Sequence, residues 1–283
     1  MAETLSAASE SDDDSDQSVS IHKAAKHCNV SQLRRALAAG VSPNSTNHVG
    51  QPLIISLCYL LPANYIQEAR LACLDLLRQS PDFDVNAPDR NGDLAIHYLG
   101  CHATSRNDVK FMQAVVDAGA DVNAAGGRLS RTALHWATSG SAPFVAAKID
   151  LLIRAGASVT ARDDHGKTPL DLAISQGGSA RLLDLSDDYI QIRRIYPVLL
   201  AAGAALPTST FTYGDAYLQR VITAGGWANY ERHHLDRLTA MLTPKPVPAD
   251  GPRRSRRRLS PLRHVPPEVL RRIAAFAFHV GYY

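Results

Sequence analysis

Residues 168–173, Thr-Pro-Leu-Asp-Leu-Ala, form a phrase that recurs in altered form along the chain. Earlier copies are Thr-Ala-Leu-His-Trp-Ala at 132–137, Leu-Ala-Ile-His-Tyr-Leu at 94–99 and Ser-Ile-His-Lys-Ala-Ala at 20–25. Each copy is followed downstream by a second phrase built around Ala-Gly, at 37–41, 116–120, 153–157 and 200–204. Two phrases that alternate at a spacing of tens of residues indicate a stacked repeat array.

Each feature of these phrases has a role in a helix. The threonine caps free backbone N–H groups at a helix start, and the proline is pre-set for the first helical turn. The leucine and the small alanine that follows it fall on one helical face, where the alanine lets a neighbouring repeat approach. The glycine of the second phrase is suited to the left-handed conformation that ends a helix. The sequence therefore predicts a repeated pair of helices, and short Val-Asn phrases at 85–86 and 122–123 lead from one pair into the next turn.

The two phrases resemble the ankyrin repeat, a unit of about 33 residues made of a turn and two antiparallel helices. The resemblance covers residues 20–207 and implies an all-α fold, a solenoid of about five helix-turn-helix repeats. The second repeat is degenerate, because Leu57 stands where a small residue is expected and Ser80-Pro81 replaces the glycine turn. The expected repeats, numbered one to five, are 20–44, 50–86, 91–123, 130–160 and 164–207.

The fifth repeat is longer than the others. Because Gly156 and Gly203 are farther apart than the equivalent glycines of the other repeats, its extra residues are expected to form an insert at 177–191, between the two helices. The insert carries Asp184, Asp187 and Asp188. Insertions in solenoids map to loops on one face, which are often contact surfaces. Neutral drift is the alternative, since loop length costs little free energy.

The segments that flank the array differ from it in composition. Residues 1–19 are acidic and rich in serine, cannot bury enough apolar surface to fold, and are expected to be disordered. Residues 208–243 are expected to form two helices, broken at Gly225-Gly226, that cap the open end of the stack. Residues 244–263 hold several prolines and an arginine run, which indicates a linker.

Composition favours an intracellular protein with an apolar core. Hydrophobic residues make up 45% of the 283 residues and charged residues 20%, and the net charge of +3 combines an acidic N-terminus with a basic C-terminus. The longest apolar run, 53–61, is about half the length of a membrane span, and no secretory signal is visible. We expect a cytoplasmic protein, with the nucleus as the alternative. The four cysteines have no paired spacing, which favours reduced thiols: Cys28, Cys58, Cys73 and Cys101.

Histidines recur at one position of the repeat, as His22, His97 and His135, with Asp171 in their place in the fifth repeat. The ankyrin resemblance implies that this histidine hydrogen-bonds to backbone between neighbouring repeats, a structural role rather than a metal or catalytic one. No spacing matches a zinc site, an HExxH helix or a phosphate-binding loop. We therefore expect no enzymatic activity, no cofactor and no metal.

The resemblance also implies a function: recognition of another protein, of unidentified kind, by the concave surface of the array. The residues that would face the partner lie in the turn tips and after the small residues of the first helix of each repeat. Carried over by motif position, the candidate partner surface comprises Lys26, His27, Arg90, Asp93, Arg131, Ser139, His165, Lys167, Ser175 and Gln176.

The C-terminal segment, residues 264–283, carries a second resemblance. Its Val-Pro-Pro-Glu start at 265–268, followed by an apolar stripe, is similar to the opening of an F-box, whose helix docks on the adaptor subunit of a cullin-type ubiquitin ligase. Its position after the repeats also resembles ankyrin proteins with a C-terminal SOCS box, which implies an Elongin-like adaptor. The alternative is that the helix packs back on the array as an extra cap. The stripe comprises Val269, Leu270, Ile273 and Phe276.

Three functions follow from these patterns. The first is a binding scaffold with no further activity, and the second is a substrate receptor for ubiquitin ligation that uses the C-terminal helix. The third is a nuclear regulator imported through the basic run Arg253–Arg258. No aromatic residues interleave with these arginines, so nucleic acid is not an expected partner, and neither is a membrane.

Overall fold

The computed structural model describes residues 21–58, 67–102, 105–139, 144–182, 186–206, 215–242 and 269 of the chain. Within these ranges the regular elements are helices, together with two isolated bridges that close turns, Thr46 with Pro52 and Gly126 with Arg131. The all-α prediction is therefore confirmed for the described residues. The chain divides into two compact units, Met1–Ile195 and Tyr196–Tyr283.

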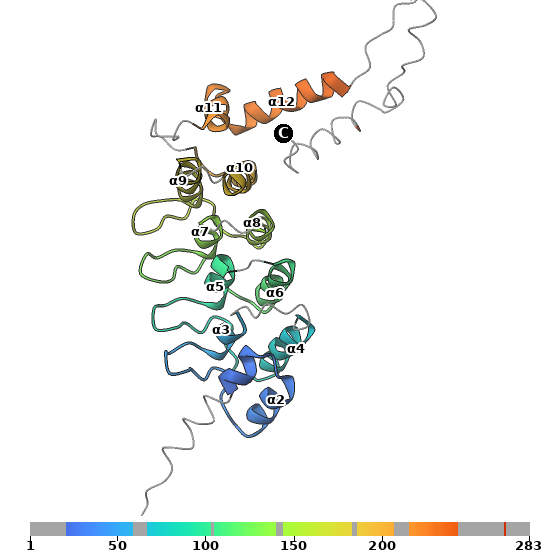
Figure 1. Ribbon diagram of the computed structural model, residues 1–283, viewed down its shortest axis with the longest axis vertical. Coiled ribbons are helices and arrows are strands. Elements are labelled where there is room, and N and C mark those ends of the chain that lie inside the picture. The colour runs from blue at the N-terminus through green and yellow to red at the C-terminus, as the bar shows by residue number, and fades with distance from the viewer. Residues whose placement is uncertain are drawn as a thin grey trace, which may run out of the picture. The chain divides into compact units, whose positions relative to one another are not determined.

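The helices of the first compact unit lie in two rows. The helices α3, α5, α7 and α9 contact one another in turn, and α2, α4, α6 and α8 form the second row beside them. The turns between successive helix pairs project from the first row, on the side away from the second (Figure 1). After a helical segment at 21–26, the helices are α2 (Val30–Ala38), α3 (Leu53–Cys58), α4 (Gln67–Arg78), α5 (Ala95–His102), α6 (Arg106–Asp117), α7 (Ala133–Thr138), α8 (Val145–Arg154) and α9 (Pro169–Leu182).

The second-row helices α6 and α8 end at glycines, as predicted. Gly119 has a φ of 95° and Gly156 a φ of 90°, in the left-handed region that side chains disfavour. After α6, the amide of Ala120 donates to the carbonyl of Val115, which closes the helix end. The end of α4 differs, since neither Ser80 nor its neighbours has a positive φ.

The turn tips are held by short polar side chains. The carboxylate oxygen Oδ1 of Asp89 accepts the backbone N–H groups of Asn91, at 2.8 Å, and of Asp93, at 2.9 Å. Asn47 and Asp163 each accept two backbone N–H groups in the same way. A side chain that satisfies two amides at once fixes the direction in which the chain enters the next first-row helix.

Three asparagines join successive repeats. The amide nitrogen of Asn86 donates to the carbonyl of Gly119 at 3.1 Å, and its oxygen accepts the N–H of Asp121 at 2.8 Å. Asn44 and Asn123 make the same pair of bonds to the backbone of the repeat that follows them. Each of these amides therefore bridges two repeats through main-chain groups alone.

The repeated histidines form a second set of bridges, and the predicted hydrogen bonds between neighbouring repeats are confirmed. In each ring Nε2 donates to a backbone carbonyl, because a carbonyl oxygen can only accept. Burial lowers the pKa of His22 and of His135, so both rings are neutral at neutral pH. The three bonds run from His22 to Ser45 at 3.0 Å, from His97 to Ala124 at 2.8 Å and from His135 to Lys167 at 3.0 Å.

The extra residues predicted at 177–191 lie where α9 ends and α10 (Ser186–Ala201) begins, but they extend the two helices instead of forming a long loop. Helix α9 continues to Leu182, and α10 begins soon afterwards, so most of the segment is helical. The residues after Gly177-Gly178 include alanine, arginine and two leucines, which are good helix formers. A glycine costs about 1 kcal/mol relative to alanine inside a helix, and a long run of helix formers offsets that cost.

The second compact unit contains the two helices predicted around Gly225-Gly226. They are α11 (Ala216–Thr223) and α12 (Trp227–Leu242), and both glycines have a positive φ. Asp215 caps α11 by accepting the N–H of Tyr217 at 2.8 Å. Tyr230 stacks against His234 and meets Tyr217 edge-on, each with ring centroids 5.6 Å apart. The role of these helices as a cap stays a prediction.

Several sequence predictions fall on residues outside the described ranges. These are the disordered tail 1–19, the linker 244–263 with its arginine run, and Leu270, Ile273 and Phe276 of the C-terminal stripe. Val269 of that stripe is helical and 42% exposed. The four cysteines are free, as their spacing predicts. In the part of the chain that the structure describes, no helix combines the length and the apolar character needed to cross a membrane.

Candidate functional site

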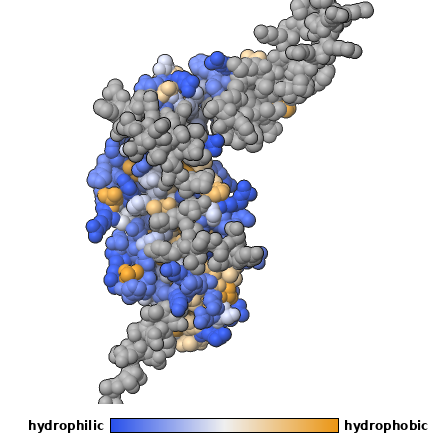
Figure 2. Space-filling view, in the orientation of Figure 1, coloured by the Kyte–Doolittle hydropathy of each residue, from blue (hydrophilic) through white to orange (hydrophobic). Residues whose placement is uncertain are grey.

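On the face seen in Figure 2, the coloured residues are mainly hydrophilic, and hydrophobic residues appear there in small, separate patches. The large exposed apolar side chains of the described residues are Val49, Ile222 and Val269. Of the candidate partner residues, Lys26, His27, Arg90, His165, Lys167, Ser175 and Gln176 are exposed, whereas Asp93, Arg131 and Ser139 are half-buried.

Asp93, Arg131 and Lys167 occupy one position of the repeat, just before the first helix of repeats three, four and five. Arg131 makes its contacts within the chain. Its Nε donates to Asp163 Oδ2 at 3.2 Å, and its guanidinium carbon lies 5.4 Å from the ring centroid of Trp136. Although burial opposes it, bonds from the Lys167 amide and Arg131 hold the pKa of Asp163 below its usual value. Repeat four thus satisfies its own charged groups.

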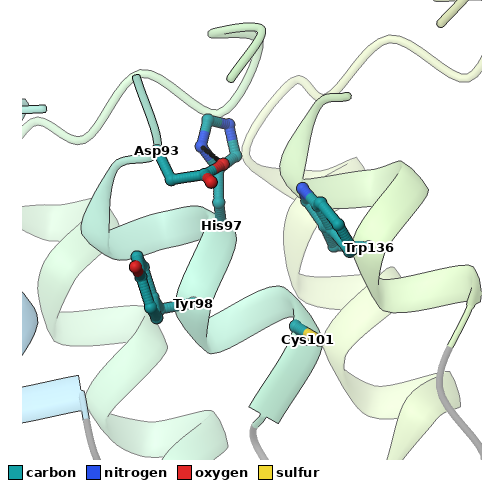
Figure 3. A pocket seen from close by; sticks show the side chains of 5 residues that line it. All are labelled: Asp93, His97, Tyr98, Cys101 and Trp136. Carbon is teal, nitrogen blue, oxygen red and sulfur yellow. Dashed lines mark ion pairs between the residues drawn. The ribbon is translucent and has the colours of Figure 1, made fainter. Parts of the chain in front are cut away.

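Asp93 is not satisfied in this way. Its Oδ1 lies 3.5 Å from Nδ1 of His97, the contact drawn as a dashed line in Figure 3. That nitrogen accepts the N–H of Leu94 at 3.0 Å, and Nε2 of the same ring donates to Ala124. The ring is therefore neutral and presents a lone pair, not a proton, to the carboxylate. Asp93 Oδ1 is buried and has no hydrogen-bond partner among the described residues.

A pocket of about 160 Å³ opens at this carboxylate, lined by the five side chains of Figure 3. Asp93 precedes α5, and His97, Tyr98 and Cys101 belong to that helix. Trp136 comes from α7, the next helix of the first row. The pocket therefore lies between repeats three and four, on the row from which the turns project.

The aromatic walls of the pocket are fixed by the packing around them. The hydroxyl of Tyr98 donates to Asp89 Oδ2 at 2.8 Å and accepts from the side-chain amide of Gln51 at 3.1 Å. Trp136 is held beneath the guanidinium of Arg131. Its indole Nε1 is buried, and no hydrogen-bond acceptor for it exists in the described ranges. Two of the residues that line the pocket therefore carry a buried, unpaired polar atom, the acceptor Asp93 Oδ1 and the donor Trp136 Nε1.

The thiol and the imidazole of this pocket are not arranged as a nucleophile and its base. Burial raises the pKa of the Cys101 thiol, so the nucleophilic thiolate is disfavoured at neutral pH. Both ring nitrogens of His97 are engaged with the backbone, which leaves no free base beside the thiol. Among the described residues, no group of three or more histidine, cysteine or acidic side chains is arranged to hold a metal ion.

Burial also raises the pKa of Asp93. The neighbouring His97 acts in the opposite direction, and the Asp89 carboxylate raises the pKa to a smaller extent. Of the ten residues predicted from the sequence, Asp93 alone lines the pocket; Tyr98, Cys101 and Trp136 were missed. A signal for the aromatic pair was present, because the residue after the repeated histidine is a tyrosine in repeat three and a tryptophan in repeat four.

Two buried cations behind the first row were also missed. Arg70 on α4 donates from Nε to the carbonyl of Leu57 and from Nη1 to Asp108 Oδ1, both at 2.7 Å. Its guanidinium carbon lies 3.8 Å from the ring centroid of Phe111. Arg70 therefore neutralises a buried acid and binds a carbonyl in the last turn of α3, where a cation is favoured.

Lys148 likewise binds a backbone carbonyl near the end of α5. Its side chain is fully buried, and Nζ donates to the carbonyl of Gly100 at 2.7 Å. Burial lowers the pKa of Lys148 to about 8. Because Lys148 belongs to α8, this bond ties repeat four to the first helix of repeat three. A charged residue inside the apolar stripe of Val145, Ile149 and Leu152 was the available signal.

Neither the protein-family models nor the curated protein sequences compared with this chain gave a match.

Proposed function

We propose that the protein is an ankyrin-repeat scaffold that binds another protein along the face formed by its turn tips and first-row helices. Support for the ankyrin assignment comes from the paired rows of helices and from the histidine and asparagine bridges at matching positions of successive repeats. On this proposal the protein has no enzymatic activity of its own, and its role is to hold a partner.

The observation that carries the proposal is the pocket between α5 and α7. Tryptophan, tyrosine and arginine are the residues most enriched at the energetic centres of protein interfaces, and Tyr98, Arg131 and Trp136 lie together here. An unsatisfied buried polar group costs about 1–3 kcal/mol. A partner that pairs with Asp93 and with the Trp136 indole therefore gains free energy that the isolated chain forgoes.

Site-specific photo-crosslinking tests this proposal. The crosslinker benzoylphenylalanine replaces Ser139, next to the pocket at the end of α7, or Gln113, an exposed residue of the second-row helix α6. We expect a discrete protein adduct in cells from position 139 and none from position 113. The substitution Trp136→Ala in the 139 variant should remove the adduct. Equal adducts from both positions, or an adduct that survives Trp136→Ala, would contradict binding at this face.

The two alternative functions depend on other residues. The ubiquitin-ligase alternative needs the C-terminal stripe, and the nuclear alternative needs the run Arg253–Arg258. Apart from Val269, these residues lie outside the described ranges, so both alternatives stay predictions from the sequence.

A further inference from the structure

We propose that the pocket between α5 and α7 receives the side chain of an arginine from the partner protein. This inference rests on the proposed function and names the chemistry of its central contact. It follows from three properties of the pocket: its charge, its size and the nature of its walls.

The charge of the pocket calls for a cation. Asp93 Oδ1 is buried without a donor, and the neutral His97 ring supplies none. A second carboxylate, that of Asp89, lies nearby and adds to the negative potential. A neutral donor would satisfy one lone pair and leave the charge uncompensated, whereas a guanidinium or ammonium group supplies both a proton and the opposite charge.

No cation of the described chain fills this role. Arg131 is turned to Asp163 on the side of repeat five, and the side chain of Arg90 lies against Gly50 in repeat two. The ammonium of Lys148 is bonded to Gly100. The equivalents of Asp93 in repeats four and five, Arg131 and Lys167, are basic. Asp93 is therefore the acidic residue at this repeat position, between the basic Arg131 of repeat four and the uncharged Gln51 of repeat two.

The size and walls of the pocket favour one planar side chain. A volume of about 160 Å³ is below the roughly 300–1,000 Å³ of pockets for whole small-molecule ligands. It is close to the cavity of about 150 Å³ that holds a single benzene ring. Tyr98 and Trp136 supply aromatic surface, and the delocalised guanidinium of arginine stacks on such rings better than the compact ammonium of lysine does.

The chain's two tryptophans provide an internal readout, because Trp136 lines the pocket and Trp227 belongs to the other compact unit. We would titrate the ¹⁵N-labelled full chain with N-acetyl-arginine methylamide and follow both indole N–H resonances by NMR. The Trp136 resonance should shift and saturate with a Kd in the millimolar range, as expected for a contact of few atoms. The Trp227 resonance should stay in place.

Three related probes test the chemistry: the citrulline, lysine and leucine derivatives with the same blocked ends. Citrulline keeps the shape of arginine without its charge, and we expect at least a tenfold weaker effect from it, as from lysine and leucine. Asp93→Asn should weaken arginine binding at least tenfold. Asp164→Asn removes an exposed carboxylate from the neighbouring turn and should leave binding unchanged.

Several outcomes would overturn the proposal: no Trp136 shift with arginine, an equal shift with citrulline, or an equal shift with lysine. If Asp93→Asn lowers the melting temperature, the comparison of arginine with citrulline on the unaltered chain still decides. Failure here is separable from failure of the proposed function. A crosslinked partner at position 139, together with no arginine binding, would support the proposed scaffold function and overturn only the proposal that the pocket receives an arginine.

Discussion

Repeats three and four place a histidine at the same position and bond it to backbone in the same way, yet they treat its neighbours differently. In repeat four the hydroxyl of Thr132 lies 2.8 Å from His135 Nδ1, and Arg131 pairs with Asp163. In repeat three a leucine replaces the threonine, and Asp93 has no donor. At this position repeat four pairs its charged side chain within the chain, whereas repeat three leaves Asp93 Oδ1 buried and unpaired. Buried polar groups are nearly always paired, so the unpaired carboxylate oxygen of Asp93 lowers the stability of the isolated chain.

The largest effect expected from this comparison comes from removing the two histidines. His135→Leu leaves the amide and the hydroxyl of Thr132 unpaired, whereas the carbonyl of Lys167 keeps the N–H of Asp163. We expect a loss of about 3 kcal/mol in the free energy of unfolding, since each buried unpaired group costs about 1–3 kcal/mol. His97→Leu should lower the free energy of unfolding by a smaller amount, about 2 kcal/mol. It also removes the Nδ1 lone pair that faces the Asp93 carboxylate, and relief of this repulsion offsets part of the loss. Urea denaturation of both variants measures the difference, and equal losses would break the comparison.

The bond that ties the two repeats together should depend on pH. The pKa of Lys148 is about 8 in the folded chain, against 10.5 for an ordinary lysine. Between these values the unfolded chain binds more protons than the folded one, so the free energy of unfolding rises with pH. From pH 7 to pH 10 we expect unaltered protein to gain on the order of 2 kcal/mol relative to Lys148→Met.

The difference between the two proteins is the quantity to measure. Burial raises the pKa of Cys58 and of Cys73 to about 12, from 9 in the unfolded chain, which lowers stability above pH 9 in both proteins. Subtracting the two urea series removes this shared contribution. A gap that stays constant over the pH range would show that the ammonium of Lys148 is not buried in solution.

The smallest effect concerns the acid itself. Asp93→Asn removes an unpaired buried charge and supplies an amide donor beside His97 Nδ1, so it should raise the free energy of unfolding by about 0.5–1 kcal/mol. The matched variant Asp163→Asn should lower it, because that carboxylate accepts Arg131 and two backbone amides. Thermal melting of both variants gives the signs. A destabilised Asp93→Asn protein would mean that the carboxylate has a structural role.

The features that the sequence predicted are those set by short-range rules. The left-handed glycines after α6 and α8 follow from the backbone alone, and the break at Gly225-Gly226 follows from helix propensity. The histidine bridges were inferred from the ankyrin resemblance and agree with the observed bonds. The extra residues at 177–191 were predicted from the long spacing between Gly156 and Gly203, which gives their number and place but not their helical conformation.

The pocket was outside the reach of the same rules. It exists because Asp93 and Trp136, from different repeats, come together when α5 packs beside α7. The unpaired state of Asp93 depends on which nitrogen of His97 carries the proton, and that is fixed by the amide of Leu94. No pattern along the chain encodes a tautomer. Arg70 and Lys148 were within reach, since each interrupts an apolar helical stripe.

The asparagine bridges have a consequence for how such a chain can change in length. The side-chain amides of three asparagines bond only to main-chain atoms of the next repeat, so these contacts do not depend on the side chains of that repeat. The three are Asn44, Asn86 and Asn123. Excising a whole repeat between two such contacts, or duplicating one, leaves a matching contact on either side. Recombination can therefore change the number of repeats without disrupting these hydrogen bonds. The side chains of each repeat can meanwhile diverge toward separate roles.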